Sequence, residues 1–448
     1  MNRLRLSHWL IGLVLLVALG LADAPRAHAH PPCPGDHAPG VVLARFHAPI
    51  LTAEQSGLHI VAAIPGIDVV AIRTPIGQEC AARETLARDP RVAFAELDHA
   101  IHAAEAFIPN DPGWPNQWGP LKIGAPAAWS TTTGAPHVVI AVLDSGTQLP
   151  HPDLTANLWT NPGELPGNGL DDDGNGKADD IWGWHFYHEW AWDGTQYTYL
   201  PRQDNRIADD YGHGTHVAGI AAARIHNGVG IAGMAGTARL MTVKVLDQYG
   251  NGWYSDLAQG IVYAVDNGAR VINISAGGNP SSQMLQEAVD YAHARGALVV
   301  AAAGNDGGAV LYPAACERAL AVAATDQNDL RAGFSSHGPQ VDVAAPGVTI
   351  YSTWYRGNYF TRSGTSMATP HVAGLAALIW SARPHLTGLQ VSEIITATAL
   401  DANSGSLQLP GWDEYLGWGR IDAARALSAT VQTPPGRYLY LPLLLRAG

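Results

Sequence analysis

The sequence predicts an α/β domain whose mainly parallel sheet is covered by helices on both faces. From about residue 110 to residue 426, short β-branched runs alternate with Ala-rich stretches of helical length. The expected strands are continuous apolar runs, which are typical of a parallel sheet buried on both faces. Ligands bind at the carboxyl ends of the strands in such a sheet, so we expect the chemical residues just after strands.

The elements of this domain follow from the same pattern. The six expected strands are His137–Leu143, Leu240–Leu246, Arg270–Ser275, Ala297–Ala303, Ala319–Thr325 and Val341–Ala345. The five expected helices are His213–Arg224, Ser255–Asn267, Met284–Arg295, Ser366–Ala382 and Gly388–Thr398.

Residues 1–29 are predicted to be a secretory signal peptide. Arg3 and Arg5 supply its positive start, residues 9–21 its apolar stretch, and Ala27-His28-Ala29 a small-x-small cleavage site. The alternative is a membrane anchor, but these 13 apolar residues are too few to span a bilayer. No later segment is long enough to cross a membrane, so we expect a secreted protein.

Residues 30–108 are predicted to form a small α+β module. Three apolar runs indicate strands at residues 41–43, 69–72 and 92–95, and residues 80–88 indicate a short helix. A module of this size between a signal and a larger domain is the expected form of a propeptide. A small independent domain is the alternative.

Residues 109–430 are predicted to form the main domain. Residues 431–448 are a tail, for which a terminal strand and a surface-retention tag are the two interpretations.

Composition argues against several classes of function. The net charge of −13 argues against a nucleic-acid groove and favours bound divalent cations. Three cysteines are too few for a disulfide framework. Cys33 and Cys80 are able to pair, although the sequence does not show that they do. Cys316 is expected to be a buried small hydrophobe rather than a nucleophile.

Three segments carry the residue types that peptide hydrolysis needs. Asp144 ends a buried strand in "VVIAVLDSGTQLPHPDL", His213 begins a helix in "DDYGHGTHVAGIAAA", and Ser366 begins another in "SGTSMATPHVAGLAALIW". A serine hydroxyl becomes nucleophilic beside a base, and the base needs a carboxylate to fix its tautomer. A serine at a helix N-terminus also places the attacked carbonyl near free backbone N–H groups.

Together these segments resemble the signature segments of the subtilisin-like (subtilase) family, in its chain order Asp, His, Ser. The resemblance covers most of residues 110–426 and implies a three-layer α/β/α domain with a mainly parallel sheet of about seven strands. It also implies a secreted serine endopeptidase that acts on protein or peptide substrates through an acyl-enzyme. Within the family pattern His213 is the base, whereas His216 and His371 are structural and Ser363 is not the nucleophile.

The segment "ARDPRVAFAELDHAI" resembles the end of the inhibitor-type propeptides that precede subtilisin-like enzymes. This resemblance implies a zymogen that processes itself between His102 and Pro109. The propeptide would serve as an intramolecular inhibitor and chaperone. We expect the mature enzyme to be a monomer.

The resemblance also assigns substrate-contacting residues. Asn305, in "LVVAAAGNDG", is expected to donate its side-chain amide to the oxyanion beside the backbone N–H of Ser366. An extended peptide is expected to pair with the edge at "NISAGG". Leu311 is expected at the bottom of the main specificity pocket. The residues expected to wall that pocket are Ser275, Ala276, Gly277, Gly278, Ala302, Ala303 and Gly304.

Calcium is the expected cofactor, at two sites. The resemblance places one site at Asp111, Asp153 and Asn227, with backbone carbonyls of Ile225, Val229 and Ile231. The segment "GLDDDGNGKADDIWGW" has the alternating acid spacing of an EF-hand loop but carries Trp182 where that loop has glutamate. A shorter loop site and a solvated acidic turn are the two interpretations. The expected ligands of the shorter site are Asp171, Asp173, Asn175 and Asp179, with Asp180 as an extra ligand.

This loop belongs to an aromatic-rich insertion, residues 155–208, that either rims the active-site cleft or packs a surface subdomain.

Three other functions compete with the protease interpretation. A binding protein on an inactive protease fold would be expected to lack one of the four catalytic side chains, and all four are present. An α/β-hydrolase esterase needs a Gly-x-Ser-x-Gly elbow and a different chain order. An acid-acting relative would carry Glu in place of His213.

Overall fold

The structure is a computed structural model that describes residues 37–48, 57–99, 106–192, 195–402 and 411–429. The chain divides into two compact units, residues 1–104 and residues 105–448. The expected signal peptide and its cleavage site, Cys33, part of the expected processing region and the tail at 431–448 lie outside the described residues. Within the described part of the chain, no helix has the length and apolar character needed to cross a membrane.

The first unit is a four-stranded antiparallel sheet with one helix. Its spatial order is β2-β3-β1-β4. A small core of its own includes Val42, Ala44, Leu86 and Leu97. The structure confirms the three predicted strands and the helix, and it adds β2, a mostly exposed edge strand. The elements are β1 (His37–Phe46), β2 (Ile60–Ile64), β3 (Val69–Arg73), α2 (Glu79–Ala87) and β4 (Val92–His99).

The second unit is built on an eight-stranded sheet in the order β12-β11-β10-β9-β5-β8-β6-β7. Every neighbouring pair is parallel except β6 and β7. All six predicted strands are present within one or two residues of their expected ends. The strands are β5 (Val139–Asp144), β6 (Gly183–Trp192), β7 (Tyr197–Asp204), β8 (Arg239–Lys244), β9 (Val271–Ile274), β10 (Leu298–Ala302), β11 (Leu320–Thr325) and β12 (Val341–Pro346).

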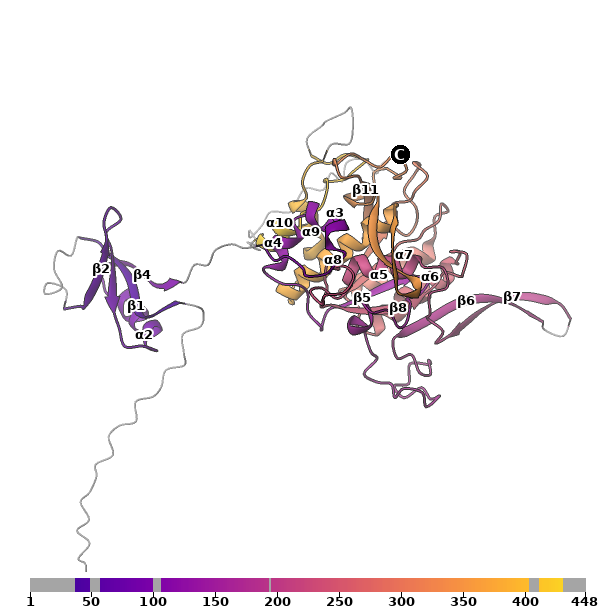
Figure 1. Ribbon diagram of the computed structural model, residues 1–448, viewed down its shortest axis with the longest axis horizontal. Coiled ribbons are helices and arrows are strands. Elements are labelled where there is room, and N and C mark those ends of the chain that lie inside the picture. The colour runs from indigo at the N-terminus through magenta and orange to yellow at the C-terminus, as the bar shows by residue number, and fades with distance from the viewer. Residues whose placement is uncertain (1–36, 49–56, 100–105, 193–194, 403–410, 430–448) are drawn as a thin grey trace, which may run out of the picture. The chain divides into compact units, whose positions relative to one another are not determined.

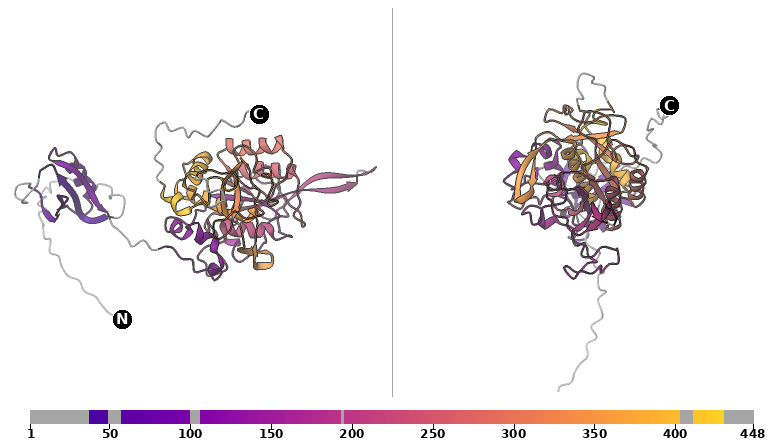
Figure 2. Two further views of the ribbon diagram at one scale, coloured as in Figure 1. Left: turned by 90° about the horizontal axis from the view of Figure 1, so that it is seen from above. Right: turned by 90° about the vertical axis from the view of Figure 1, so that its right-hand side faces the viewer.

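Alternate residues of the central strands face two separate cores, which explains their continuous apolar runs. In β5, Ile140 and Val142 face one core, whereas Ala141 and Leu143 face the other. Figure 2 shows helices on both sides of the sheet. The first core includes α5 (His213–Ala222), α8 (Thr365–Ala382), α9 (Gly388–Thr398), α4 (Ala125–Trp129) and α10 (Ala423–Ser428). The second includes α6 (Tyr254–Asp266) and α7 (Gln283–Ala294). The expected three-layer α/β/α architecture is confirmed.

Three smaller elements complete the second unit. Helix α3 (Trp118–Lys122) precedes α4, and β13 (Ile350–Trp354) pairs with β14 (Asn358–Arg362) as an antiparallel hairpin. Residues 114–116, 155–157 and 355–357 form single 3₁₀ turns.

The insertion extends the sheet instead of forming a separate subdomain. Strand β6 pairs with β8 only from Gly183 to His185, but it pairs with β7 as far as Trp192 and Tyr197. The two strands therefore leave the sheet as a two-stranded arm, which Figures 1 and 2 show projecting from the body of this unit. We call residues 186–192 and 197–203 the arm.

Candidate active site

The carboxylate of Asp144 holds the imidazole of His213. Asp144 ends β5 and is fully buried, and His213 is the first residue of α5. One carboxylate oxygen, Oδ1, accepts hydrogen bonds at 2.7 Å from Nδ1 of His213 and from the backbone N–H of Ser145. A proton held on Nδ1 leaves Nε2 as the basic nitrogen.

The close approach of α5 to β5 depends on a glycine. A Cβ on Gly214 would lie 2.2 Å from the carbonyl oxygen of Gly146 and 3.1 Å from Cβ of Asp144. Any side chain at this position would therefore push the helix away and lengthen the Asp144–His213 bond.

Two opposing effects set the pKa of His213. Burial lowers it, whereas the carboxylates of Asp144 and Asp209 raise it, and the net pKa lies above the ordinary histidine value. Nearby negative charge thus stabilises the protonated form of His213. A general base needs this stabilisation because it carries a proton during the reaction.

Ser366 lies in the first turn of α8, with only 8% of its surface exposed. Its hydroxyl donates to the backbone carbonyl of Ser275 at 3.0 Å, just after β9. The hydroxyl is therefore held by a backbone carbonyl and not by His213. Bonds between a nucleophile and its base often tighten only when substrate binds.

Asn305 and the backbone N–H of Ser366 flank one small space. The amide oxygen of Asn305 accepts from the N–H and the hydroxyl of Thr365, at 2.8 and 3.0 Å, so its NH₂ group is turned away from that residue. A Cβ built on Gly364 would lie 3.5 Å from Nδ2 of Asn305 and 3.6 Å from N of Ser366. The amide nitrogen of Asn305 and the backbone nitrogen of Ser366 thus lie close to one position beside Gly364.

A cavity of about 310 Å³ adjoins these donors. The Leu311 side chain reaches into the space between its walls, since Cβ atoms on Gly304 and Gly277 would lie 2.8 and 3.0 Å from it. Six of the seven predicted wall residues line the cavity. The exception is Ala303, which is fully buried and bonds through its backbone to Val322 and Leu311. The lining residues are Ser275, Ala276, Gly277, Gly278, Asn279, Ala302, Gly304, Asn305, Asp306, Leu311, Thr365 and Ser366.

Residues 136–419 match the subtilase family. The chain belongs to this family. It is 42% identical over 323 residues to thermitase of Thermoactinomyces vulgaris, and the alignment covers 72% of this chain and 99% of thermitase. It is 39% identical over 319 residues to subtilisin E of Bacillus subtilis (strain 168), covering 70% of this chain and 72% of that protein.

A solved structure supports the same assignment. A structure described as proteases from Pseudoalteromonas arctica aligns with a TM-score of 0.58 and 34% identity, over 71% of this chain and 98% of that one. The predicted family and fold are therefore confirmed, and the chain is a serine endopeptidase that acts on peptide bonds.

The structure of this subtilase reveals two positioning residues that the sequence alone does not single out. Asp209 is buried and accepts hydrogen bonds from Ser145, Gly212 and Thr215, which tie the end of β5 to the first turn of α5. Buried Lys244, which ends β8, donates to the carbonyl of Ser145 and to Asp210. Asp209 stands in the quoted "DDYGHGTH" segment, but hydrogen bonds to residues 64 positions away are not visible in a sequence.

The other histidines, serine and cysteine considered as nucleophiles or bases lie in surroundings typical of structural residues. Burial lowers the pKa of His216 to about 3 and that of His371 to about 4, and each bonds a backbone carbonyl. The hydroxyl of Ser363 accepts from the N–H of Thr349. Cys316 is a buried free thiol, and burial raises its pKa to about 11. These surroundings agree with the expected structural roles.

The residues expected at the first calcium site include two buried acids, Asp111 and Asp153, which both bond to the loop after α5. Asp111 accepts from the N–H of His226 at 2.8 Å, and Asp153 accepts from the side chain of Asn227 at 3.0 Å and from the N–H of Ile231 at 2.8 Å. Ile225 and Val229 belong to the same loop. Burial raises the pKa of Asp153 to about 7, and the charge of Asp111 adds to this effect. A cation here would favour both ionised carboxylates.

The second expected calcium site differs from its predicted ligand set. Among the residues that the structure describes, Glu164, Asp173 and Asp180 form a group of three acids whose oxygens lie within 4.8 Å of one another. Asp171 accepts from N–H groups of residues 174–176, and Asp179 from those of Gly167 and Gly169. The structure therefore does not bring Asp171 and Asp179 into the acidic cluster. Glu164, nine residues before Asp173, replaces them.

Oxygen chemistry at this acidic cluster suits a hard cation. Asn175 donates to Asp173 and Asp180, while its own buried amide oxygen has no partner. Burial raises the pKa of Asp180. Carboxylate and amide oxygens are the ligands that Ca²⁺ takes in proteins, so the residues present fit such an ion.

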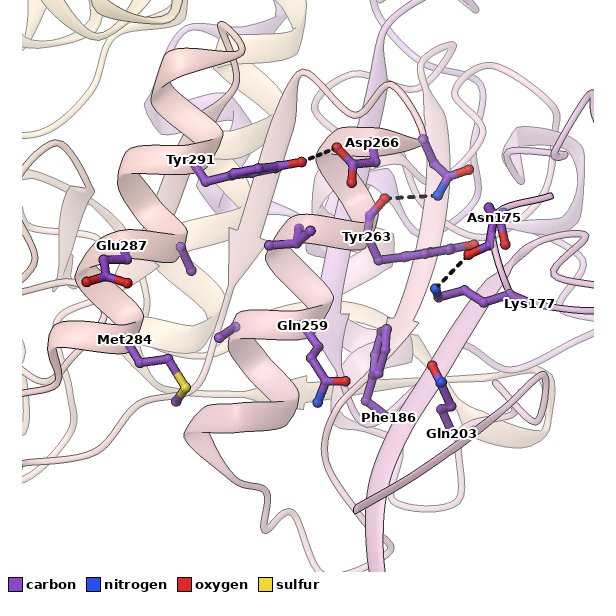
Figure 3. Close-up of a pocket in the computed structure, with 14 residues that line it drawn as sticks. Asn175, Lys177, Phe186, Gln203, Gln259, Tyr263, Asp266, Met284, Glu287 and Tyr291 are labelled. Atoms are coloured by element: carbon purple, nitrogen blue, oxygen red, sulfur yellow. Dashed lines mark hydrogen bonds between the residues drawn. The ribbon is translucent and has the colours of Figure 1, made fainter. Parts of the chain in front are cut away.

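A second cavity lies beside this loop. It has a volume of about 540 Å³ and opens between the insertion and helices α6 and α7 (Figure 3). Lys177 lies against the ring of Tyr263 there and donates to the carbonyl of Asn175. None of Asp144, His213, Ser366 and Asn305 lines this cavity.

Proposed function

We propose that the chain is a secreted serine endopeptidase in which Ser366 is the nucleophile, His213 the general base and Asp144 its partner. The observation that carries this proposal is the 2.7 Å bond between Asp144 and His213 Nδ1, in a domain where Ser366 and Asn305 line one cavity. All four side chains come from one chain, so we propose a monomer.

The reaction would proceed through an acyl-enzyme. Ser366 Oγ attacks the peptide carbonyl while Nε2 of His213 takes the hydroxyl proton. Nδ2 of Asn305 and the N–H of Ser366 stabilise the oxyanion. His213 then gives its proton to the leaving amine as the C–N bond breaks. A water molecule, deprotonated by His213, releases the acyl group and restores the Ser366 hydroxyl.

We also propose that residues 30–108 are a propeptide removed by this same site between His102 and Pro109, after a signal peptide at 1–29. Two features support this division: the first unit has its own hydrophobic core, and the two units separate between Ala104 and Glu105. The ring of Phe107 already packs against Trp129 in the second unit. Cleavage before Phe107 is therefore the outcome we favour within this range, and it would leave residues 107 and 108 on the mature enzyme.

Calcium is the cofactor we propose for both acidic sites. Asp111, Asp153 and Asn227 would hold one ion with the loop at residues 225–231, and Glu164, Asp173 and Asp180 the other. The ions would stabilise loops and supply no step of the reaction, since Asp144, His213 and Ser366 belong to neither group.

The full chain with Ser366→Ala tests the proposal, with Ser363→Ala as a matched control. Ser366→Ala should lose hydrolysis of unfolded casein and should remain unprocessed when purified free of other proteases. Ser363→Ala should cleave casein and mature like wild type. If Ser366→Ala matures at the normal rate, self-processing by this serine is wrong.

A further inference from the structure

The arm carries an exposed aromatic face. Trp190 lies opposite Tyr199 and Trp192 opposite Tyr197 in the β6–β7 register. The ring centroids of these pairs are 5.1 and 5.2 Å apart. Residues two apart on a strand share a face, so all four rings lie on one side of the arm. Trp190, Trp192 and Tyr197 are 68%, 58% and 67% exposed.

The opposite face of the arm has a different character. It carries Ala191 and Thr198, and Glu189 accepts a hydrogen bond from Arg202 at 2.7 Å. Tyr187 and Leu200 share this face in the same register, so it is mixed in character, and the cluster of exposed paired rings lies on the other face. Large exposed apolar surface of this kind marks an interaction site more often than chance, because leaving it in water is unfavourable.

Trp253 and Tyr254 lie between the aromatic face and the cavity beside Ser366. The ring of Trp253 lies 5.7 Å from that of Tyr199 and 5.6 Å from that of His188. Trp253 is itself 53% exposed and directly precedes Tyr254. The hydroxyl of Tyr254 would lie 2.6 Å from a Cβ on Gly278, which lines the 310 Å³ cavity beside Ser366.

The root of the arm is anchored to the domain. Nδ1 of His188 lies 3.0 Å from the carboxylate of Asp256, which is 1% exposed in the first turn of α6. Because Trp253 immediately precedes this same helix, the anchor also fixes the position of the aromatic face relative to Trp253. The aromatic rings are therefore held in a defined position at this end of the arm.

We propose that the arm's aromatic face binds the polypeptide substrate upstream of the scissile bond. This proposal rests on the proposed function. In this proposal the residue whose side chain enters the cavity supplies the acyl carbonyl, and the chain N-terminal to it runs along Ser275–Gly278 toward Tyr254 and Trp253. An extended peptide advances about 3.3 Å per residue, so every second residue matches the spacing of the ring pairs. The segment recognised is extended, uncharged and apolar.

Two quenched peptides with the same cleavage sequence test this proposal. The short one has four residues upstream of the scissile bond, and the long one has twelve, with apolar side chains and no charge. The enzyme matured from the full chain should show a kcat/KM roughly tenfold higher for the long peptide, which corresponds to about 1.4 kcal/mol of added binding. In Trp190→Ala with Trp192→Ala, the two values should become equal while the short-peptide value stays unchanged.

The matched control is Glu189→Ala with Thr198→Ala on the opposite face of the arm, which should keep the wild-type ratio. Trp192→Ala alone, far from the anchored root, should lower the ratio even if the double variant folds poorly. Equal ratios in wild type, control and both arm variants would overturn the proposal. A second result would also overturn it: wild type and the control are dimers in sedimentation, and the arm variants are monomers. The aromatic face would then bind a second copy of the chain. Failure of wild type to cleave the short peptide would instead refute the proposed function.

Discussion

The carboxylate of Asp209 accepts hydrogen bonds from both the backbone N–H and the hydroxyl of Thr215. Its other oxygen accepts from Ser145 and Gly212. Ser145 directly follows Asp144, and Thr215 lies in the first turn of the helix that His213 begins. One buried acid therefore joins the segments that carry the carboxylate and the base.

We expect Asp209→Asn to change the pH dependence of catalysis. The negative charge of Asp209 raises the pKa of His213, and a general base works only when neutral. Activity is present above this pKa and is lost as the pH falls through it. Removing the charge lowers the pKa, so the acidic limb of kcat/KM should move to lower pH.

Asp209→Asn should also unfold more easily, by about 1–3 kcal/mol, because an amide cannot accept every bond that the carboxylate accepts. Asp247→Asn is the control, since the carboxylate of Asp247 accepts from the N–H groups of Tyr249 and Asn251 within its own turn. Kinetic pH profiles and thermal melting measure both effects. An unchanged acidic limb in Asp209→Asn would mean that this residue supports only the fold.

Asn305→Ala should lower kcat by roughly 10²–10³ with little change in KM, because its amide would donate only to the charge that develops in the transition state. Steady-state kinetics with a short peptide amide gives both constants. Asn279→Ala is the control, since Asn279 lines the same cavity outside the proposed oxyanion position. A raised KM at constant kcat would show that Asn305 binds the ground state.

Leu311 should restrict the side chain that enters the cavity. Small and medium apolar residues should be preferred by wild type, and Leu311→Gly should raise kcat/KM for large aromatic residues relative to alanine by roughly tenfold or more. A peptide library that varies this one position measures the preference. The exposed Leu330→Gly controls for a general effect of glycine. Identical profiles for wild type and Leu311→Gly would place the specificity determinant elsewhere.

Calcium should stabilise the enzyme without changing its chemistry. An ion that binds only the folded state adds roughly 4 kcal/mol at a thousand times its Kd. A chelator should therefore lower Tm and hasten self-digestion, while brief assays in the cold stay nearly unchanged.

The acidic cluster can be tested separately with Asp173→Ala and Asp180→Ala together. This variant should contain one calcium fewer than wild type by elemental analysis. Asp172→Ala, an exposed acid of the same loop, should keep the full content. Equal calcium content in all three proteins would show that the acidic cluster binds no calcium and that its loop is stabilised by its own hydrogen bonds.

The sequence by itself determined the family, the layer architecture and the order of the central elements. The central strands could be predicted because both their faces are buried, so every residue of β5 is apolar until Asp144. Local motifs also identified Asp144, His213, Ser366 and Asn305 as candidates, since the strand-end and helix-start positions of these residues are encoded within a few neighbours.

Only the tertiary structure decided which distant groups meet. It placed Glu164 beside Asp173 and Asp180, whereas Asp171 and Asp179 accept hydrogen bonds from backbone N–H groups. The fold of the loop decides which of its carboxylates lie near one another and which bond to the backbone. It also turned the insertion into an arm that continues the sheet. The aromatic residues of β6 and β7 alternate as strands do, but the partner of each strand is specified by pairing in space and not by local sequence.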